Sequence, residues 1–438
     1  MPPHVVLGAG LTGLSAAHSL QVAGAETVVF DQAERPGGHC RSNVVDGYVF
    51  DYGPHILFTN DAAMETLIRD LLGDNLRAQE REAFIYHAAY DLYTRFPFQA
   101  HLYGLPVPLV RDCLLSLVEA VEARARGSVA PANYEEWMRS TFGDVIAERL
   151  MIPYARKIWT VEPTTMDFNW IGRRVPTPDV ARILTGALTD DVQQVGATSH
   201  FWYPWRGGIE SLPAALARRV TDIECGRRAT SLDLTSRVVG LADGDEVEFD
   251  SLVYTLPLNL LPQLVGDLPG EVRSACAALT YQGILNVNLG LAREERSDKH
   301  WVYFYEDEFP FHRLSFPANF SPHNVPPGKS SISTEVAFSE ADELDVDAAV
   351  QATVAALRRA RILDADDEIE VIHAEAILPA YVIYDLRHTR SVATIAEWLR
   401  GHRVHAAGRF GQWEYLNMDH ALLQGRRAAL RILDAHAP

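Results

Sequence analysis

The stretch HVVLGAGLTGLSAAHSL, residues 4–20, decides the fold. Its first four residues read as a short β-strand, glycines follow at once, and apolar residues then recur at helical spacing. A second apolar run at 27–30 ends directly before Asp31. A Gly-x-Gly-x-x-Gly turn between a strand and a helix, with an acidic residue at the end of the next strand, predicts a Rossmann-like βαβ unit that binds a dinucleotide.

Each residue of this motif has a physical task in such a unit. Gly8 makes the tight turn, Gly10 lets backbone N–H groups approach a pyrophosphate, and Gly13 lets the helix pack closely on the strand. Asp31 is placed to hold a ribose hydroxyl. The alternative is an ordinary glycine turn, which needs neither the flanking strand and helix nor the acidic residue.

The residues after Asp31 indicate which dinucleotide binds. Gly37-Gly38 and the residues around it resemble the FAD-binding superfamily of amine oxidases and their relatives, in which a flavin pyrophosphate lies along this loop. The predicted FAD ligands here, beside the motif itself, are Gln32, Gly37, Gly38, His39 and Arg41. No second motif of this kind follows a strand, so we expect the flavin to be reduced by an external reductant.

The segment VHAAGRFGQWEYLNMD, residues 404–419, precedes the last predicted helix. A Gly-Arg pair between a strand and a helix start brings backbone donors and a cation to the flavin edge. We therefore assign Arg409, Asn417 and Met418 to the cofactor site. The alternative is a surface salt bridge with core aromatic residues.

Composition excludes several functional classes. The 438 residues carry 39 Lys and Arg against 58 Asp and Glu, a formal charge of -19, so nucleic acid is not an expected partner. The four cysteines lie far apart without metal-ligand spacing, and we expect no metal. No apolar run approaches the ~20 residues that span a bilayer, and no signal peptide is evident. We expect a cytoplasmic protein without membrane contact, either a monomer or a homodimer.

The order of elements predicts an α/β protein whose domains are discontinuous in sequence. A Rossmann-like FAD-binding domain is expected from 1–78, 205–260 and 398–438, with an inserted helical substrate domain at 98–170. An antiparallel sheet domain is expected from 79–97, 171–204 and 261–397. One of the helical segments is predicted as a continuous helix over 142–159.

Further motifs resemble the UDP-galactopyranose mutase family, which interconverts pyranose and furanose rings of a nucleotide sugar. The run DYGPHILFTND at 51–61 looks like the segment after the flavin loop in that family. Four later stretches agree in order, and Arg313 falls where the family has a phosphate-binding arginine. These stretches are 96–99 (FPFQ), 154–159 (YARKIW), 174–176 (RVP) and 205–208 (WRGG). The resemblance spans the chain from end to end.

The resemblance implies a reaction without net redox, in which N5 of the reduced FAD attacks the anomeric carbon and forms a covalent flavin–sugar adduct. Arg313 would clamp the diphosphate with Arg174 as the second cation, and His55 would lie near the flavin ring. The remaining substrate-binding residues implied by the resemblance are Gln99, Tyr154, Trp159 and Tyr415. Taken singly, each of these residues could instead be a core aromatic, a buried histidine or a surface cation.

Departures from the family pattern fall on the nucleotide and sugar contacts. Five positions differ from the residue that the family usually has. Phe58 replaces a histidine, Pro178 an arginine, Val336 a tyrosine, Asn417 an aspartate, and Leu150 an aromatic residue that stacks on uracil. These departures indicate related chemistry on a substrate other than UDP-galactose, and a GDP-hexose is the leading choice. Two alternatives remain open: an oxidase or dehydrogenase of the amine oxidase class, and a non-catalytic flavoprotein whose helical segment binds a partner.

Overall fold

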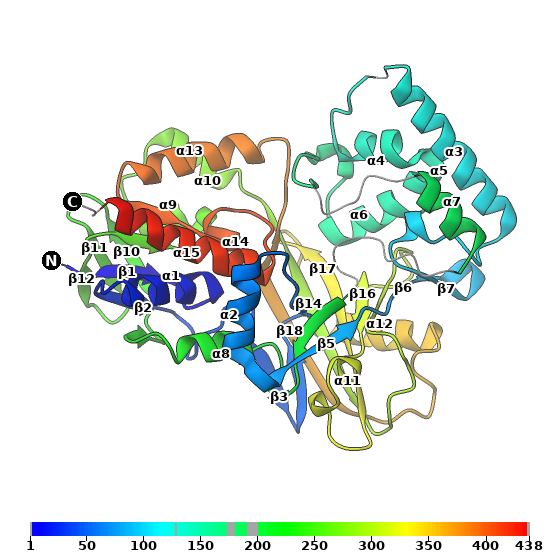
Figure 1. Cartoon of the computed structure of the whole chain (residues 1–438), viewed down its shortest axis with the longest axis horizontal. Helices are drawn as coiled ribbons and strands as arrows, with labels where there is room; N and C mark the ends of the chain where they lie inside the picture. Colours follow the sequence, from blue (N-terminus) through cyan, green and yellow to red (C-terminus); the bar gives the residue numbers. More distant parts are fainter. Residues whose placement is uncertain (1, 128, 173–179, 191–199, 436–438) are drawn as a thin grey trace.

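A computed structural model describes residues 2–127, 129–172, 180–190 and 200–435. The chain forms three parts that share one long cavity: a parallel sheet with its helices, an antiparallel sheet, and a group of helices at the upper right of Figure 1. Both termini lie beside the parallel sheet. The predicted α/β class with a Rossmann-like unit, an inserted helical part and an antiparallel sheet is confirmed.

The parallel sheet has five strands in the order β19-β13-β1-β2-β9. Along β1, alternate residues face opposite sides: Val6 packs under α1 and α15, whereas Val5 and Leu7 pack toward α10 and α13. The close contact of α1 with α15 depends on Gly425, since a Cβ there would lie 2.1 Å from the carbonyl oxygen of Thr12. The bounds are β1 His4–Leu7, α1 Leu11–Val22, β2 Thr27–Phe30, β9 Ile223–Glu224, β13 Leu252–Tyr254, α10 Gly270–Ala277, α13 His388–Arg400, β19 Val404–Ala406 and α15 Met418–Ala435.

The antiparallel sheet has seven strands in the order β18-β14-β17-β16-β15-β6-β7, with β15 and β6 as its parallel pair. In its register, Arg313 lies opposite Tyr303 on one neighbour and opposite Glu335 on the other, so the three side chains share one face. The bounds are β6 Ala83–His87, β7 Leu92–Arg95, β14 Tyr281–Leu291, β15 Trp301–Tyr303, β16 Arg313–Ser315, β17 Ser330–Ser339, β18 Ile369–Val382 and, on the sheet's outer face, α12 Val346–Arg359.

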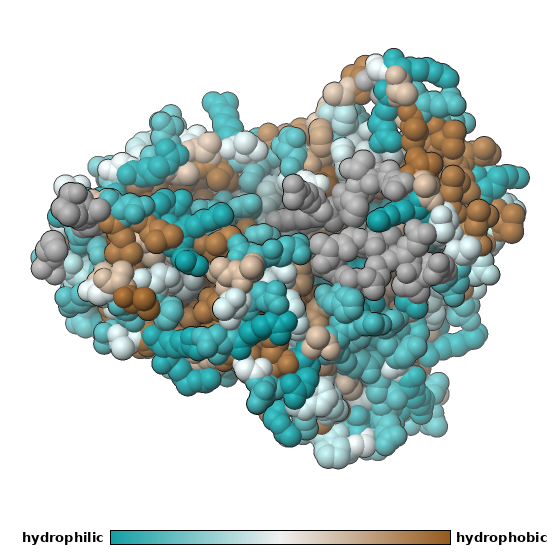
Figure 2. Space-filling view, in the orientation of Figure 1, coloured by the Kyte–Doolittle hydropathy of each residue, from teal (hydrophilic) through white to brown (hydrophobic). Residues whose placement is uncertain are grey.

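The helical part contains α3 (Val107–Ala125), α4 (Tyr134–Phe142), α5 (Asp144–Ile146), a π-helical turn (Ala147–Met151), α6 (Ile152–Trp159) and α7 (Val180–Leu188). The helical segment predicted over 142–159 is confirmed from Asp144 to Trp159, where α5, the π-helical turn and α6 follow one another without a break, whereas Phe142 belongs to α4. Gly143 at φ 85° ends α4, and Pro153, which has no N–H to donate, follows the widened turn. Figure 2 shows apolar surface gathered over α3 and α7, where Leu115 and Leu188 are exposed.

Shorter elements connect these parts. They are β3 Ser42–Val45, β4 Tyr48–Asp51, α2 Ala62–Leu72, β5 Leu76–Glu80, β8 His200–Pro204, α8 Ser211–Ala217, β10 Ala229–Asp233, β11 Val238–Leu241, β12 Glu246–Glu248, α9 Leu261–Leu264, α11 Pro317–Phe320 and α14 Gly408–Gly411. Of the helices within the described ranges, none combines the length and the apolar character that crossing a membrane requires.

Packing moves two of the expected domain boundaries. Residues 261–279 and 384–397 were expected in the antiparallel sheet domain, but their buried side chains join the core under the parallel sheet, as Val272 and Ile395 do. Helix α7 was expected there too, but Ile183 and Ala187 pack with Leu117 of α3. The sequence pattern indicates which residues are buried, but it does not indicate which layer they pack against. These assignments therefore needed the tertiary contacts.

Candidate active site

One cavity of about 1700 Å³ runs from the glycine loop after β1, past the end of β18, to the helical part. Pockets for a single small ligand are roughly 300–1,000 Å³, so this one has room for a dinucleotide and a second ligand together. Most residues predicted as ligands line it: Gly8, Gly10, Asp31, Gln32, Gly37, Gly38, His39, Arg41, His55, Gln99, Tyr154, Arg313, Arg409, Tyr415, Asn417 and Met418.

The glycine loop forms a cradle, and any side chain in place of its glycines would collide with the neighbouring chain or occupy the cradle. A Cβ on Gly8, whose φ is 103°, would lie 2.2 Å from Oγ1 of Thr255, and one on Gly13 would lie 1.8 Å from the carbonyl oxygen of Gly8. Gly13 therefore acts in packing and does not line the cavity. Helix α1 begins after Gly10 without a side-chain cap, which leaves its first-turn N–H groups for an anion. These features fit a pyrophosphate.

Asp31 joins the loop to the end of β2. Its carboxylate accepts hydrogen bonds from the backbone N–H groups of Ala9 (2.6 Å) and Ala33 (2.8 Å), one on each oxygen. A carboxylate has about four acceptor sites, so lone pairs remain for a ribose hydroxyl on the cavity side. Arg227 and Arg228, which belong to none of the motifs, also line this end.

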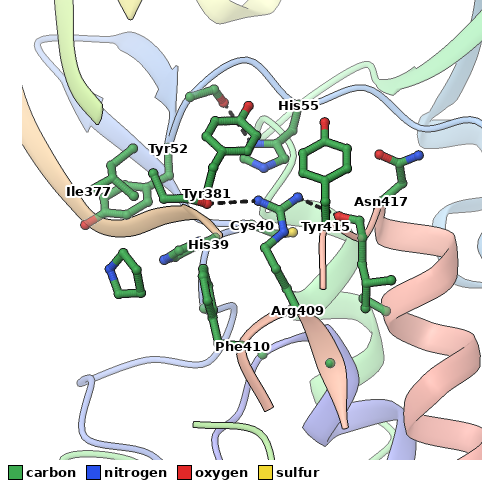
Figure 3. A pocket seen from close by; sticks show the side chains of 18 of the residues that line it. His39, Cys40, Tyr52, His55, Ile377, Tyr381, Arg409, Phe410, Tyr415 and Asn417 are labelled. Carbon is green, nitrogen blue, oxygen red and sulfur yellow. Dashed lines mark hydrogen bonds between the residues drawn. The ribbon is translucent and has the colours of Figure 1, made fainter. Parts of the chain in front are cut away.

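Arg409 is held rigidly in the middle of the cavity (Figure 3). Its Nη1 donates to the carbonyl oxygen of Ala380 (3.3 Å), and its Nη2 donates to that of Leu416 (2.5 Å). The guanidinium also lies over the rings of Tyr381 and Tyr415, 5.6 and 5.1 Å from their centroids. A fixed cation here would interact with developing negative charge on a flavin ring without first having to reorganise.

Two histidines flank this arginine. Burial, then the nearby Arg409, lowers the pKa of His39 to about 3 and that of His55 to about 4, so both rings are neutral at pH 7. The Nδ1 atom of His55 lies 2.8 Å from the carbonyl oxygen of Gly53. In the neutral ring Nδ1–H is the donor of this bond, which leaves Nε2 as an acceptor.

Arg313 lies farther along the cavity and is paired with Glu335, which is 4% exposed at its side chain. The arginine Nε donates to a carboxylate oxygen of Glu335. Burial opposes the charge of each group, but their mutual attraction prevails: the pKa of Arg313 is raised and that of Glu335 is lowered. The pairing uses Nε alone, so the Nη groups remain available to an anion in the cavity.

An aromatic wall continues from Arg313. The ring of Tyr303 meets that of Tyr154 edge to face at 5.7 Å and stacks on that of Phe96 at 4.5 Å. The guanidinium carbon of Arg81 lies 5.8 Å from the centroid of the Phe96 ring. All five residues line the cavity.

Three expectations for the substrate residues need comment. Trp159 does not line the cavity; its ring packs against those of Trp170 and Tyr381, which do, so it is a supporting residue. Helical spacing placed it on the same helix as Tyr154 but five residues on, which turns it to another face. Arg174 and Pro178 lie outside the described residues.

Sequence reasoning missed several lining residues, chiefly Arg81, Tyr303, Glu335 and Tyr381. Val336 stands where the family pattern has a tyrosine. It packs against the apolar cluster under α12. Tyr303, Glu335 and Tyr381 come from strands with no motif of their own, and Arg81 lies between β5 and β6. Only the register of the sheet brings them together.

Comparison with known proteins fits this arrangement. Residues 11–433 match the sequence family described as flavin containing amine oxidoreductase. The chain belongs to the flavin-containing amine oxidoreductase family. Its cofactor is accordingly a flavin, and the glycine cradle, Asp31 and Arg409 are residues suited to hold it.

Curated relatives within this family include oxidases of porphyrinogens. Human protoporphyrinogen oxidase is 24% identical over 326 residues, covering 65% of this chain and 66% of that protein. Coproporphyrinogen III oxidase of Mycobacterium tuberculosis is 24% identical over 291 residues, 62% of each chain. The alignments with the first curated relatives span about half to two thirds of their length.

Solved structures give a more complete match. The structure of reduced UDP-galactopyranose mutase superposes with a TM-score of 0.93 at 26% identity, covering 99% of this chain and 94% of that one. The resemblance drawn from the sequence motifs is thereby confirmed, and the low identity marks this chain as a divergent relative. Putrescine oxidase shares the fold at a TM-score of 0.68 and 17% identity, with 99% of each chain covered.

Proposed function

We propose that this protein is an FAD-dependent mutase that interconverts the pyranose and furanose forms of a nucleotide diphosphate hexose, without net redox. The observation that carries the proposal is Arg313: its guanidinium, on a side chain that is 20% exposed, lines the substrate half of the cavity, is held by Glu335 through Nε alone, and keeps its Nη groups for a diphosphate. The end-to-end likeness to UDP-galactopyranose mutase supports the same reading.

In this proposal the cavity divides between cofactor and substrate. The loop at Gly8 and Gly10 with Asp31 holds the adenosine and pyrophosphate of FAD, which is why we favour FAD among the flavins. The reduced flavin supplies a nucleophilic N5 for the anomeric carbon and is regenerated unchanged. Arg313 stabilises the diphosphate as it leaves and holds it for its return.

Other residues position the sugar and exclude water. Tyr154 and Tyr415 border the substrate, and Gln99 lies toward the helical part. His55 is neutral and presents an acceptor nitrogen, so it can take a hydrogen bond from a sugar hydroxyl or a flavin N–H without adding charge beside Arg409.

We favour a GDP-hexose over UDP-galactose. Leu150 lines the cavity at the position where the related mutases have an aromatic residue that stacks on uracil, and its neighbour Met151 is also a flexible apolar side chain. A pyrimidine loses its stacking partner there, whereas a larger purine can contact more of this surface.

The test is to incubate dithionite-reduced protein with a panel of UDP-, GDP- and dTDP-hexoses and to separate the products. We expect one donor to be converted to a second sugar ring form of the same mass, with oxidised protein and protein loaded with 5-deaza-FAD both inactive. Turnover with the oxidised flavin, or no isomerisation of any nucleotide sugar, would contradict the proposal.

The alternative is an FAD-dependent amine oxidase or dehydrogenase, favoured by the oxidases among the relatives. Such an enzyme needs two rings far enough apart to hold its substrate between them, about 7–8 Å at ordinary contact distances. The centroids of Tyr381 and Tyr415 are 5.4 Å apart at 18°, and Arg409 lies against both. Peroxide formed in step with amine consumption would favour the oxidase.

A further inference from the structure

The end of the cavity that lies in the helical part carries few hydrogen-bonding side chains. It is lined by Tyr134, Leu150, Met151, Trp170 and Ile171. The indole N–H of Trp170 donates to the backbone carbonyl oxygen of Asp167 at 2.7 Å, so it already has its partner. The hydroxyl of Tyr134 is the other strong hydrogen-bonding group of these five side chains, and among the described residues it has no partner.

Tyr134 is fixed in position although its hydroxyl is unpaired. The residue is 7% exposed, and its ring stacks on that of Trp137 at 6.0 Å and meets that of Trp170 edge to face at 5.6 Å. Burial raises the pKa of Tyr134, and no neighbouring charge or hydrogen bond adds to that effect. Buried polar groups nearly always have a hydrogen-bond partner. A fixed, buried hydroxyl at the wall of a cavity therefore points to a partner among the molecules that fill the cavity.

The position of Tyr134 relative to Arg313 indicates which part of a ligand it meets. Tyr154 of α6 contacts the ring of Tyr303, which is in register with Arg313, so Tyr154 marks the place of the diphosphate along this helix. Met151 precedes Tyr154 by nearly one turn, about 5 Å along the axis, and packs in the same apolar cluster as Tyr134. A ribose attached to a diphosphate at Arg313 would place the base of the nucleotide at this end of the cavity.

We propose that Tyr134 is a specificity-determining residue whose hydroxyl forms a hydrogen bond with the edge of the nucleotide base, while Leu150 and Met151 contact the face of the base. This inference rests on the proposed mutase function and adds to it the contact that selects the nucleotide. A phenol can both donate and accept a hydrogen bond, so it can pair with a carbonyl oxygen or an amino group of a base. Arg313 serves the diphosphate of any donor, whereas Tyr134 responds to the base.

An unpaired hydroxyl that serves a ligand predicts opposite effects on folding and on binding. In the ligand-free holoenzyme, Tyr134→Phe removes a polar group without a protein partner, so the urea midpoint should stay equal or rise. Tyr203→Phe should lower the midpoint, because that buried hydroxyl donates to Asp51 at 2.6 Å. A fall for Tyr134→Phe as large as that for Tyr203→Phe would mean that the Tyr134 hydroxyl is bonded within the protein, and it would overturn the proposal.

Binding is measured by calorimetric titration of the holoenzyme with GDP, UDP, ribose 5-diphosphate and pyrophosphate. For Tyr134→Phe we expect the Kd of the tighter-binding nucleotide to rise about 5-fold, the effect of one neutral hydrogen bond. The Kd of ribose 5-diphosphate and that of pyrophosphate should not change, since neither has a base. Weaker binding of either of these two ligands, or unchanged binding of both nucleotides, would overturn the proposal.

Tyr103 offers a matched control within the helical part, because it is 50% exposed and does not line the cavity. Tyr103→Phe should bind all four ligands as the wild type does. Flavin content and circular dichroism should show that every variant folds with its cofactor.

The failure of this inference and that of the proposed function can be distinguished. If a nucleotide sugar is isomerised and Tyr134→Phe binds both nucleotides normally, the mutase stands and the base contact is wrong. If no donor is isomerised, yet Tyr134→Phe binds one nucleotide more weakly and pyrophosphate normally, the base contact stands and the mutase is wrong. If the wild type binds neither nucleotide, both are overturned.

Discussion

The most decisive test of the diphosphate clamp removes the charge of Arg313 without leaving the carboxylate of Glu335 as an unpaired charge. The two side chains form an ion pair in which the carboxylate side chain is 4% exposed and the arginine side chain is 20% exposed. Loss of one partner of such a pair costs about 3–5 kcal/mol of stability, because the other charge stays buried. Arg313→Met alone would therefore confuse unfolding with lost binding, so the perturbation is Arg313→Met in a Glu335→Gln background.

The expected magnitude follows from the donors left to the arginine. Of five N–H donors on a guanidinium, Nε–H is taken by Glu335 and four remain on the Nη groups. Two charge-assisted bonds to a diphosphate, each about 1.5–3 kcal/mol, give about 3–6 kcal/mol, or roughly 10² to 10⁴-fold in affinity. Glu335→Gln keeps an acceptor for Nε–H, so we expect that variant to stay within ~10-fold of wild type.

The assay is calorimetric titration with UDP and GDP, alongside kcat/KM for the best donor, FAD content and urea unfolding. We expect Glu335→Gln to bind the nucleoside diphosphate nearly normally and the double variant to lose at least ~100-fold with its flavin retained. A double variant that binds within about fivefold of Glu335→Gln would refute the clamp and pass the anion site to Arg174.

Two further predictions concern the cofactor half. Gly10→Val should fold but be colourless, because a Cβ at Gly10 has its nearest protein atom 3.8 Å away and yet occupies the space for the pyrophosphate. Gly13→Val should not fold, because a Cβ at Gly13 would lie 1.8 Å from a carbonyl oxygen. Absorbance at 450 nm measures the bound flavin, and circular dichroism measures folding. The pKa of His55 is lowered by burial to about 4 from an ordinary 6.5, so the unfolded chain takes up its proton first and the free energy of unfolding should fall as pH drops from 6.5 toward 4. The His55→Asn variant should show a smaller fall in urea midpoint over this range, and identical pH profiles of the two proteins would contradict the assignment. Burial raises the pKa of Asp51 to about 6, so Asp51 changes stability with pH in the opposite direction, but it is present in both proteins.

The local elements could be predicted from the sequence because local patterns determine them. Strands His4–Leu7 and Thr27–Phe30 occur at the predicted residues, since each is a short apolar run that ends directly before a glycine or an acidic residue. The helical segment expected over 142–159 begins at Asp144, because Gly143 ends α4, and it contains a π-helical turn before Pro153 that periodicity does not reveal.

The substrate half of the site was less accessible to sequence reasoning. Tyr303, Arg313 and Glu335 lie 10 and 22 residues apart, and only the antiparallel register sets them side by side. Arg313 was found through its family resemblance, whereas its partner Glu335 carried no motif. Non-local pairing of this kind leaves no periodic signal, so contacts between strands remain hidden until their register is known.

What distinguishes a mutase from an oxidase on this shared fold is therefore a matter of charge in the substrate half, since the flavin half serves both. An oxidised amine or porphyrinogen does not call for a guanidinium at this position, where the attraction of Glu335 keeps Arg313 charged. Arg313, anchored at Nε and open at its Nη groups, is understandable if a diphosphate completes its coordination in the working enzyme.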